Sequence, residues 1–417
     1  MSTILLSAYA CEPGKGSEPA VGWMWATELA ASGHQVWVLT RDSNRSAIEA
    51  GMPSPGPACL HFEYCDLPRY ARGWKKLPGA IYLYYFLWQA LAFRAARRLN
   101  RAHHFDRVHH VSFVSLRAPS FMGWLGIPFY FGPLSGGECV PQDLRRGMTR
   151  RARAFEFARD CANWLTRFDP LMRSALRQAA RIYVTSRDSL NLIPRKYHYK
   201  CEVHLAVGIT RQQLGFSRRK QVDARRELRC LYTGRLLEWK GLHLAILAMH
   251  RLQAHDAPVR LTIIGDGPAK AALLSLASRL GVANRITWHS WLPHTELQSR
   301  LHQHDVFVFP SLRDSGGMAV IEALAHGLPV VCTDLGGPGE IVSNQCGRVI
   351  ATTNRSAGDI ANSLAAHLRE LAENPGLRQS LSIGARRRAW EFEFRRLVEA
   401  IYQAPSGANP LTENVPA

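Results

Sequence analysis

Residues 307–331, FVFPSLRDSGGMAVIEALAHGLPVV, are the most informative segment of this 417-residue chain. An apolar run leads into a loop with two glycines, a helix-like segment at Ala319–His326 follows, and a second apolar run begins at Val330. A strand, a glycine loop and a helix in this order present unpaired backbone amides at a helix N-terminus, where they favour an anion such as a phosphate. The stretch therefore predicts a parallel-sheet α/β domain with an anion-binding loop.

Two carboxylates flank this loop. Asp314 comes just before Gly316 and Gly317, and Glu322 lies eight positions after Asp314, about two turns into the helix. Both can face the same ligand, and carboxylates accept bidentate hydrogen bonds of the kind that sugar hydroxyls donate. The alternative makes Asp314 a helix N-cap and Glu322 a solvated helix position.

Two further loops follow strand-like runs in the same half of the chain. The first carries Arg235 and Lys240, two cations that can neutralise a diphosphate leaving group where no metal is held. The second, Gly265-Asp266-Gly267, lies where the carboxyl edge of a parallel sheet is expected, which is where open α/β folds bind ligands. Two solvated cations and a tight glycine turn are the alternatives. The sequence contains no Asp-x-Asp metal clamp.

Apolar runs alternate with helix-like segments along the whole chain, a pattern typical of parallel-sheet α/β domains. The predicted strands are 4–9, 35–39, 107–112, 128–131 and 181–185 in the first half and 228–233, 260–264, 286–289, 306–309, 330–332 and 347–349 in the second. The predicted helices are 21–32, 81–100, 242–253, 270–281, 294–304, 319–326 and 357–373. This alternation predicts two Rossmann-like domains in tandem.

The charge balance indicates an anionic partner. The chain has 52 Lys and Arg against 33 Asp and Glu, a net charge of +19, and residues 1–200 hold 27 of the basic but only 14 of the acidic side chains. The basic runs Arg94–Arg107 and Arg145–Arg159 adjoin aromatic-rich helices, which is typical of binding at an anionic membrane surface. A solvated helical face is the alternative. No zinc finger, RNP-like motif or heptad-linked basic region supports nucleic acid binding.

The cysteines and the apolar runs bear on location. Nine cysteines without a Cys-x-x-Cys pair indicate neither a zinc site nor a disulfide framework, and favour a reducing compartment. The N-terminal run MSTILLSAYAC lacks the basic start of a signal peptide and predicts a buried strand. The longest apolar stretch, Gly79–Phe93, is too short to span a bilayer. The expected location is the cytoplasm, peripheral to the inner face of the cytoplasmic membrane.

The second half resembles the family 4 glycosyltransferases, in particular a bacterial exopolysaccharide-type subset. The resemblance lies in Gly234-Arg235 with Lys240-Gly241, in Gly265-Asp266-Gly267-Pro268, in Trp291-Leu292-Pro293 and in the segment 314–331. It implies a GT-B fold, two Rossmann-like domains facing a central cleft, and retaining transfer from a nucleotide sugar. The family's Glu-x7-Glu motif has Asp314 in place of its first Glu, so the shorter carboxylate is expected to sit further from the donor sugar.

The resemblance also implies roles for individual residues. Asp314 is expected at the sugar, Glu322 at the ribose, and Arg235 with Lys240 at the diphosphate. The remaining predicted donor-binding residues are Gly16, Gly265, Asp266, Gly267, Trp291, Leu292, Ser315, Gly316, Gly317 and Met318.

The first half resembles part of the same family more loosely. Its glycine-rich loop implies that Gly14, Gly16 and Glu18 face the cleft, and Pro19 at the third glycine position argues against a nicotinamide site. His109 and His110 end a strand and match the family's active-site histidine region, and His110 is the preferred catalytic residue, orienting donor or acceptor. The alternative is a buried strand histidine, because neighbouring strand residues face opposite sides. A second cleft-facing loop contains Gly136, Gly137 and Glu138.

The predicted protein is a metal-independent, cofactor-free retaining hexosyltransferase. It moves a hexose from a UDP- or GDP-hexose to a lipid-linked oligosaccharide or other cell-envelope glycan. The alternatives are a nucleic-acid-binding or scaffold protein on a catalytically silent GT-B frame, a phosphorylase, or a nucleotide-sugar epimerase. The predicted organisation is an acceptor-binding domain at 1–206, a linker at 207–226, a nucleotide-sugar-binding domain at 227–385, a helix at 386–403 that can cross back to the first domain, and a disordered tail at 404–417.

Overall fold

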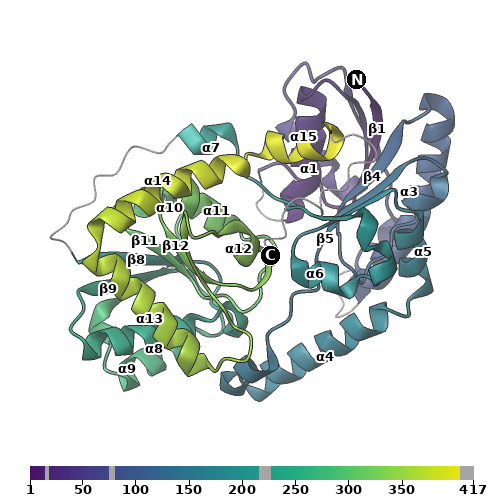
Figure 1. Cartoon of the computed structure of the whole chain (residues 1–417). Helices are drawn as coiled ribbons and strands as arrows, with labels where there is room; N and C mark the ends of the chain where they lie inside the picture. Colours follow the sequence, from purple (N-terminus) through teal and green to yellow (C-terminus); the bar gives the residue numbers. More distant parts are fainter. Residues whose placement is uncertain (15–17, 75–79, 216–226, 404–417) are drawn as a thin grey trace. The chain divides into compact units, whose positions relative to one another are not determined.

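The computed structural model describes residues 1–14, 18–74, 80–215 and 227–403, which form two parallel β-sheets with helices (Figure 1). Gly16, part of the predicted linker and the predicted tail lie outside the described residues. The chain divides into two units: the first comprises the described residues within 1–137, 160–207 and 394–417, and the second those within 138–159 and 208–393. The predicted pair of parallel-sheet α/β domains is confirmed.

The first unit is built on a seven-stranded sheet in the order β3-β2-β1-β4-β5-β6-β7. Its strands are β1 (Thr3–Ala8), β2 (Gln35–Thr40), β3 (Leu60–Tyr64), β4 (Arg107–Ser112), β5 (Phe129–Leu134), β6 (Arg181–Val184) and β7 (Cys201–Val203). Ile4, Leu5 and Leu6 are successive residues of β1 and all are fully buried. Continuous burial of this kind is expected where helices cover both faces of a parallel sheet.

Different helices cover the two faces of this first sheet. Trp88 of α3 is fully buried in the core that contains Leu5 of β1, whereas Trp25 of α1 is buried beside His109 and Phe394 of α15. The helices with residues in the first unit are α1 (Glu18–Ala31), α2 (Arg45–Gly51), α3 (Ala80–His103), the end of α4 (Arg150–Thr166), α5 (Pro170–Gln178), α6 (Arg187–Leu192) and α15 (Phe394–Gln403). The two faces of the sheet therefore have separate cores.

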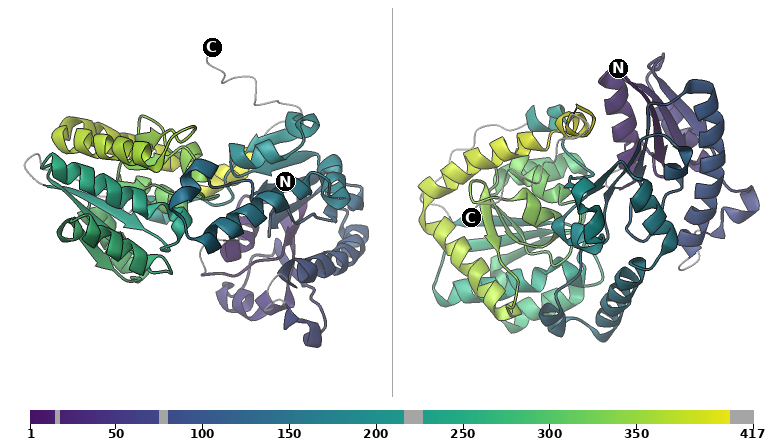
Figure 2. Two further views of the ribbon diagram at one scale, coloured as in Figure 1. Left: turned by 90° about the horizontal axis from the view of Figure 1, so that it is seen from below. Right: turned by 45° about the vertical axis from the view of Figure 1, so that its right-hand side comes forward.

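The second unit has a six-stranded sheet in the order β10-β9-β8-β11-β12-β13, with helices on both faces (Figures 1 and 2). Its strands are β8 (Leu228–Thr233), β9 (Val259–Ile264), β10 (Ile286–His289), β11 (Val306–Phe309), β12 (Val330–Thr333) and β13 (Gly347–Ile350). Its remaining helices are α7 (Arg211–Gly215), α8 (Leu242–Ala254), α9 (Lys270–Arg279), α10 (His294–Gln303), α11 (Met318–Ala325), α12 (Gly336–Ile341), α13 (Ala357–Glu373) and α14 (Pro375–Glu391).

The structure contains two strands that the sequence pattern did not indicate. β3 and β7 are the outer strands of the first sheet, and β7 has only three residues. An edge strand has one neighbour and keeps polar residues, so its sequence lacks the continuous apolar run of a central strand. Only the pairing of β3 with β2 and of β7 with β6 defines them.

The predicted first domain, 1–206, needs a correction at residues 138–159, which belong to the second unit. Thr149, directly before α4, donates its backbone N–H and its hydroxyl to the Glu238 carboxylate, both at 2.7 Å. Further along α4, Glu156 forms an ion pair with Arg313. These contacts join residues 89 and 157 positions apart, so no local pattern reports them.

The predicted C-terminal helix, 386–403, is two helices. α14 runs to Glu391 and belongs to the second unit, whereas α15 begins at Phe394 and belongs to the first. Tyr402 of α15 lies with its hydroxyl 2.8 Å from His109 Nδ1 of β4. The chain therefore returns to the first sheet, with the division between the units at residues 393 and 394.

Candidate functional site

The candidate site lies where the strand order of the second sheet changes direction. From β8 the chain builds outward through β9 to β10, and it then restarts at β11 on the other side of β8 and continues to β13. In open α/β sheets, ligands bind at the carboxyl ends of the two strands where the order reverses in this way, here β8 and β11. The loops that carry Lys240 and Asp314 follow these strands.

Two glycines let the loops after β8 and β9 touch through their backbones. Gly265 and Gly267 have φ of +149° and +157°. A Cβ at Gly265 would lie 2.0 Å from the carbonyl oxygen of Gly234, and one at Gly267 would lie 2.4 Å from that of Leu236. Any other residue type would force the loops apart. The Leu236 amide donates to the Asp266 carbonyl at 2.9 Å, so these loops form one backbone platform.

Asp314 organises the loop after β11. Its Oδ1 accepts from the amides of Gly316 at 3.1 Å and Gly317 at 2.8 Å, while its Oδ2 forms an ion pair with Lys240 Nζ. The two charged side chains are only 16% and 17% exposed. In this structure Asp314 therefore caps the glycine loop and fixes Lys240. The amides of Gly316 and Gly317, which were predicted to contact phosphate, donate to Asp314 instead. The next amides, those of Met318 and Ala319 at the start of α11, have no acceptor among the described residues.

Arg235 supplies the accessible positive charge. Its side chain is exposed and has no ion-pair partner among the described residues. Its backbone is held, because the Tyr232 hydroxyl donates to the Arg235 carbonyl at 3.2 Å. Arg235 and Lys240 thus leave the same loop, one accessible and the other paired. Glu322, Ser315 and Met318 are partly buried.

The loops after β9 and β10 add one negative and one aromatic side chain. Asp266 accepts from the Gly267 amide at 2.8 Å and lies 3.3 Å from Lys270 Nζ, and these two interactions lower the pKa of its carboxyl. Asp266 therefore stays charged at neutral pH. After β10, Trp291 is 58% exposed and Leu292 is partly buried.

Glu138 was predicted to lie with the acceptor loop of the first domain, but the structure places it in the second unit. Its side chain is 3% exposed, and its Cγ would lie 3.3 Å from a Cβ built on Gly336. Gly336 itself lies against the Asp314 carbonyl, and the Gly337 amide donates to that carbonyl at 2.8 Å. Glu138 thus adjoins the loop that holds Lys240.

The other predicted residues of the first unit lie on the loops after β1 and β5. Gly14 is exposed with φ of +73°, and Glu18 is exposed at the start of α1. Gly136 has φ of +108°, and its carbonyl accepts from Arg117 Nη1 at 3.0 Å. A Cβ at Gly137 would lie 2.4 Å from Ser189 Cα, so this glycine packs against α6.

His109 and His110 are both fully buried in β4, on opposite faces of the first sheet. His110 lies 2.9 Å from both the Tyr85 hydroxyl and Ser7 Oγ. His109 Nε2 donates to the Gly132 carbonyl at 2.9 Å, and Nδ1 is 2.8 Å from the Tyr402 hydroxyl. Both rings therefore have partners inside the first unit, which is the arrangement of buried, hydrogen-bonded strand histidines. A catalytic role for His110 stays a prediction.

Sequence reasoning assigned no role to Trp239 and Arg313, the residues directly before Lys240 and Asp314. Arg313 lies over the Trp239 ring, with its guanidinium carbon 4.4 Å from the ring centroid. The Leu312 amide donates to the Trp239 carbonyl at 2.9 Å. These contacts join the two loops at the residues directly before Lys240 and Asp314. Their only signal in the sequence is adjacency to predicted site residues.

Two kinds of feature are absent from the described residues. They contain no group of three or more His, Cys, Asp or Glu side chains placed to hold a metal ion. None of the helices they form combines the length and apolar character that crossing a membrane requires.

Comparisons with known proteins place a family match in the second half of the chain and find curated proteins that are similar to part of the chain. Residues 216–388 match the family described as "Glycosyl transferases group 1". The glycogen synthase of Mycobacterium tuberculosis is 34% identical over 197 residues, 47% of this chain and 46% of that protein. The putative colanic acid biosynthesis glycosyltransferase WcaL of Salmonella typhimurium is 35% identical over 121 residues, 28% of this chain and 30% of that protein. The chain thus spans less than half the length of these curated relatives.

Solved structures extend the likeness to both units. Anabaena HepE in complex with UDP-glucose has a TM-score of 0.55 and 14% identity, and the match covers 97% of this chain and 100% of that one. A likeness at this identity shows the fold. The chain has a GT-B fold of two parallel-sheet α/β domains, as the sequence predicted.

Proposed function

We propose that this chain is a metal-independent retaining glycosyltransferase that transfers a hexose from a nucleotide diphosphate sugar to a glycan acceptor. The observation that carries the proposal is the juxtaposition of Lys240, Asp314 and the start of α11 at the point where the sheet order reverses. This is the position for ligands in an open α/β sheet, and here it combines cations with helix-terminal amides. The family match at residues 216–388 and the similarity to a glycogen synthase support the same reaction class.

The proposed reaction needs no protein nucleophile. The acceptor oxygen bonds to the anomeric carbon on the face from which the diphosphate leaves, and the bond between that carbon and the diphosphate oxygen breaks. The acceptor proton passes to the leaving phosphate oxygen. Arg235 and Lys240 stabilise the charge that develops on the diphosphate, a contribution that is greatest in the transition state. The amides of Met318 and Ala319 are placed to add two donors.

Within this class we propose a family 4 enzyme of the exopolysaccharide type, with Glu322 at the ribose of the donor. The eight-residue spacing from Asp314 to Glu322 and the three glycine loops support this assignment. HepE was solved with UDP-glucose, which supports a UDP-hexose as the first donor to test. The name of WcaL refers to colanic acid biosynthesis, which supports a cell-envelope glycan or lipid-linked oligosaccharide as acceptor.

A nucleotide-release assay tests the proposal. The purified chain is incubated with UDP-glucose, UDP-galactose or GDP-mannose, with and without a lipid-linked glycan acceptor. A glycosyltransferase releases UDP or GDP faster when the acceptor is present and forms a product that retains the anomeric configuration. A sugar phosphate product would indicate a phosphorylase, an epimerised nucleotide sugar would indicate an epimerase, and failure to bind or turn over any nucleotide sugar would contradict the proposal.

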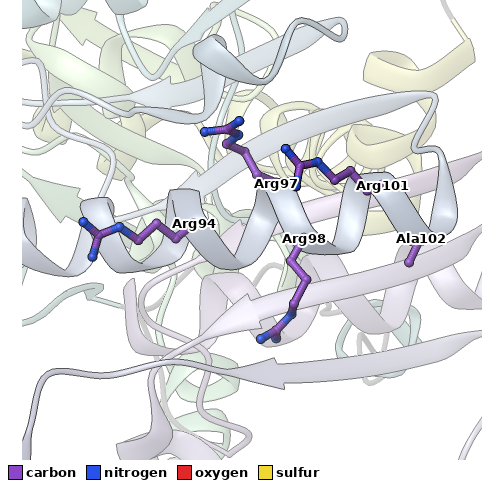
Figure 3. Close-up of a pocket in the computed structure, with 5 residues that line it drawn as sticks. All are labelled: Arg94, Arg97, Arg98, Arg101 and Ala102. Atoms are coloured by element: carbon purple, nitrogen blue, oxygen red, sulfur yellow. The ribbon is translucent and has the colours of Figure 1, made fainter.

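We also propose that the protein is cytoplasmic and binds the inner face of the membrane, and α3 supplies the surface that supports this. Arg94, Arg97 and Arg101 recur at helical spacing and line a shallow hollow on this helix (Figure 3). Leu83 and Phe86, 55% and 38% exposed, lie three turns earlier on the same side of the helix. Exposed apolar residues followed by arginines match the acyl boundary and the anionic headgroups of a bilayer interface.

Vesicle sedimentation tests this surface. Each arginine near an anionic membrane contributes about 1 kcal/mol, so changing Arg94, Arg97 and Arg101 to Gln is expected to weaken binding to phosphatidylglycerol vesicles about a hundredfold. The control changes Arg195, Lys196 and Arg251 to Gln, which removes the same charge elsewhere. Equal weakening by both variants, or equal binding to neutral phosphatidylcholine vesicles in high and low salt, would contradict the assignment.

A further inference from the structure

The second unit contains a buried charge that the proposed reaction does not use. Glu156 is the sole acidic residue in the basic run Arg145–Arg159 and is fully buried. Its Oε1 lies 3.0 Å from Nη1 of Arg313, whose side chain is 10% exposed. A carboxylate is costly to remove from water, so its burial in an otherwise basic helix needs a physical reason.

The ion pair belongs to a cluster that reaches the candidate site. Arg313 lies over the Trp239 ring, and Phe155, the neighbour of Glu156 on α4, is stacked on Trp239 with centroids 6.2 Å apart. Trp239 directly precedes Lys240, and Arg313 directly precedes Asp314. The cluster therefore fixes the backbone directly before Lys240 and directly before Asp314.

A second attachment lies one residue further back on the same loop. Glu238 accepts both the backbone N–H and the hydroxyl of Thr149, and the Thr149 hydroxyl in turn accepts from the Ala152 amide at 3.2 Å. The start of α4 is thus capped by a residue that contacts the Lys240 loop. α4 is attached to this loop through Glu238 and to the Asp314 loop through Arg313.

A buried ion pair adds little net stability, because the desolvation of both charges offsets their attraction. The geometry instead assigns Glu156 as a positioning residue: through Arg313 and Trp239 it fixes the distance between Lys240 and Asp314 that diphosphate binding requires. This inference rests on the proposed function, and it adds a residue from the first half of the sequence to the donor site. Glu156 itself touches neither the Lys240 nor the Asp314 side chain in any contact recorded for the described residues.

The test separates positioning from stability. Glu156→Gln removes the carboxylate that pairs with Arg313 and is expected to be destabilised, because breaking a buried ion pair is costly. A double variant, Glu156→Met with Arg313→Met, removes both charges and replaces them with apolar side chains of similar length, a change that is often neutral or stabilising. Arg153→Gln, at an exposed position of α4, is the matched control.

Unfolding by urea, calorimetric affinity for UDP and GDP, and kcat and KM for the nucleotide sugar are measured on each protein. The double variant is expected to keep wild-type stability but to lose roughly ten- to a hundredfold in kcat, with a smaller rise in KM, because displacing positioned groups by about 1 Å has that effect. Arg153→Gln is expected to match wild type in every measurement.

The other outcomes are distinct. A folded double variant with wild-type kcat and nucleotide affinity would overturn the positioning role while leaving the proposed function intact. Unfolding of both Glu156→Gln and the double variant would show that the pair serves the fold alone, which also overturns the inference. Failure of the wild-type protein to bind either nucleotide would instead refute the proposed donor site and this inference with it.

Discussion

Asp314 shows how one carboxylate serves two structural purposes at the candidate site. One oxygen caps the glycine loop and the other holds Lys240. Asp314→Ala removes both interactions and is expected to lower the free energy of unfolding by about 1 kcal/mol or more, the usual cost of losing a cap. Asp314→Asn keeps an oxygen for the two amides and is expected to lose less. Urea denaturation measures both.

Nucleotide affinity adds a second readout for Asp314. Both variants remove the carboxylate that holds Lys240, so the affinity for UDP is expected to change in each of them. If Asp314 instead contacted only the sugar of the donor, its substitution would leave the affinity for UDP unchanged. If Asp314→Ala were as stable as wild type and bound UDP equally well, neither the cap nor the hold on Lys240 would matter.

Arg235 differs from Asp314 because its side chain forms no ion pair among the described residues. Because its side chain is exposed, Arg235→Ala is expected to change the free energy of unfolding by no more than about 0.5 kcal/mol. Removing one preorganised charge from the diphosphate is expected to lower kcat about a hundredfold. Arg251→Ala, at an exposed position of α8, is the control for loss of surface charge. Unchanged kcat in a folded Arg235→Ala protein would remove Arg235 from the site.

The two buried histidines of β4 predict how the free energy of unfolding depends on pH. Burial lowers the pKa of both His109 and His110 to about 3, well below the ordinary value of about 6.5. Between these values both imidazoles are neutral in the folded protein, while the unfolded chain binds protons. The free energy of unfolding is therefore expected to fall on acidification through this window, by about 2 kcal/mol per histidine between pH 7 and pH 5.

Histidine-to-glutamine variants isolate this contribution from that of the titrating carboxylates. His109→Gln and His110→Gln are each expected to show a shallower loss of stability from pH 7 to pH 5 than wild type, whatever their stability at pH 7. His255→Gln, at an exposed position, is expected to retain the wild-type slope. Identical slopes in all four proteins would show that the strand histidines are protonated in the folded state.

For the whole molecule, the proposed chemistry relies on Arg235 and Lys240 for charge neutralisation. Transfer is therefore expected to proceed at the same rate after treatment with EDTA and to gain nothing from added Mg²⁺ or Mn²⁺. The measurement is nucleotide release before and after chelation, with ionic strength held constant because surface electrostatics depend on salt. Activity that disappears with EDTA and returns with either ion would contradict the proposed mechanism.

Much of the molecule was predictable because its determinants are local. The run Phe307–Val331 contains a buried strand, a glycine loop and a helix, and each follows from the apolar pattern and from backbone sterics within a few residues. The same holds for the turn Gly265–Gly267, where residue type reports the backbone conformation. The alternation of such units determined two parallel-sheet domains from the sequence by itself.

The burial and the pairing of individual side chains depend on residues far away in the sequence, so only the folded structure shows them. Whether His110 faces a ligand or a core is set by the Tyr85 and Ser7 side chains packed around it, not by its own strand. Glu156 lies in the basic run Arg145–Arg159, which both sequence interpretations place at a surface, yet in the fold it is buried against Arg313, 157 positions away. The sequence pattern predicts the strands other than β3 and β7, the glycine loops and the cations between them. Which of those charges pair and which remain accessible depends on distances between loops, and only the folded chain defines those distances.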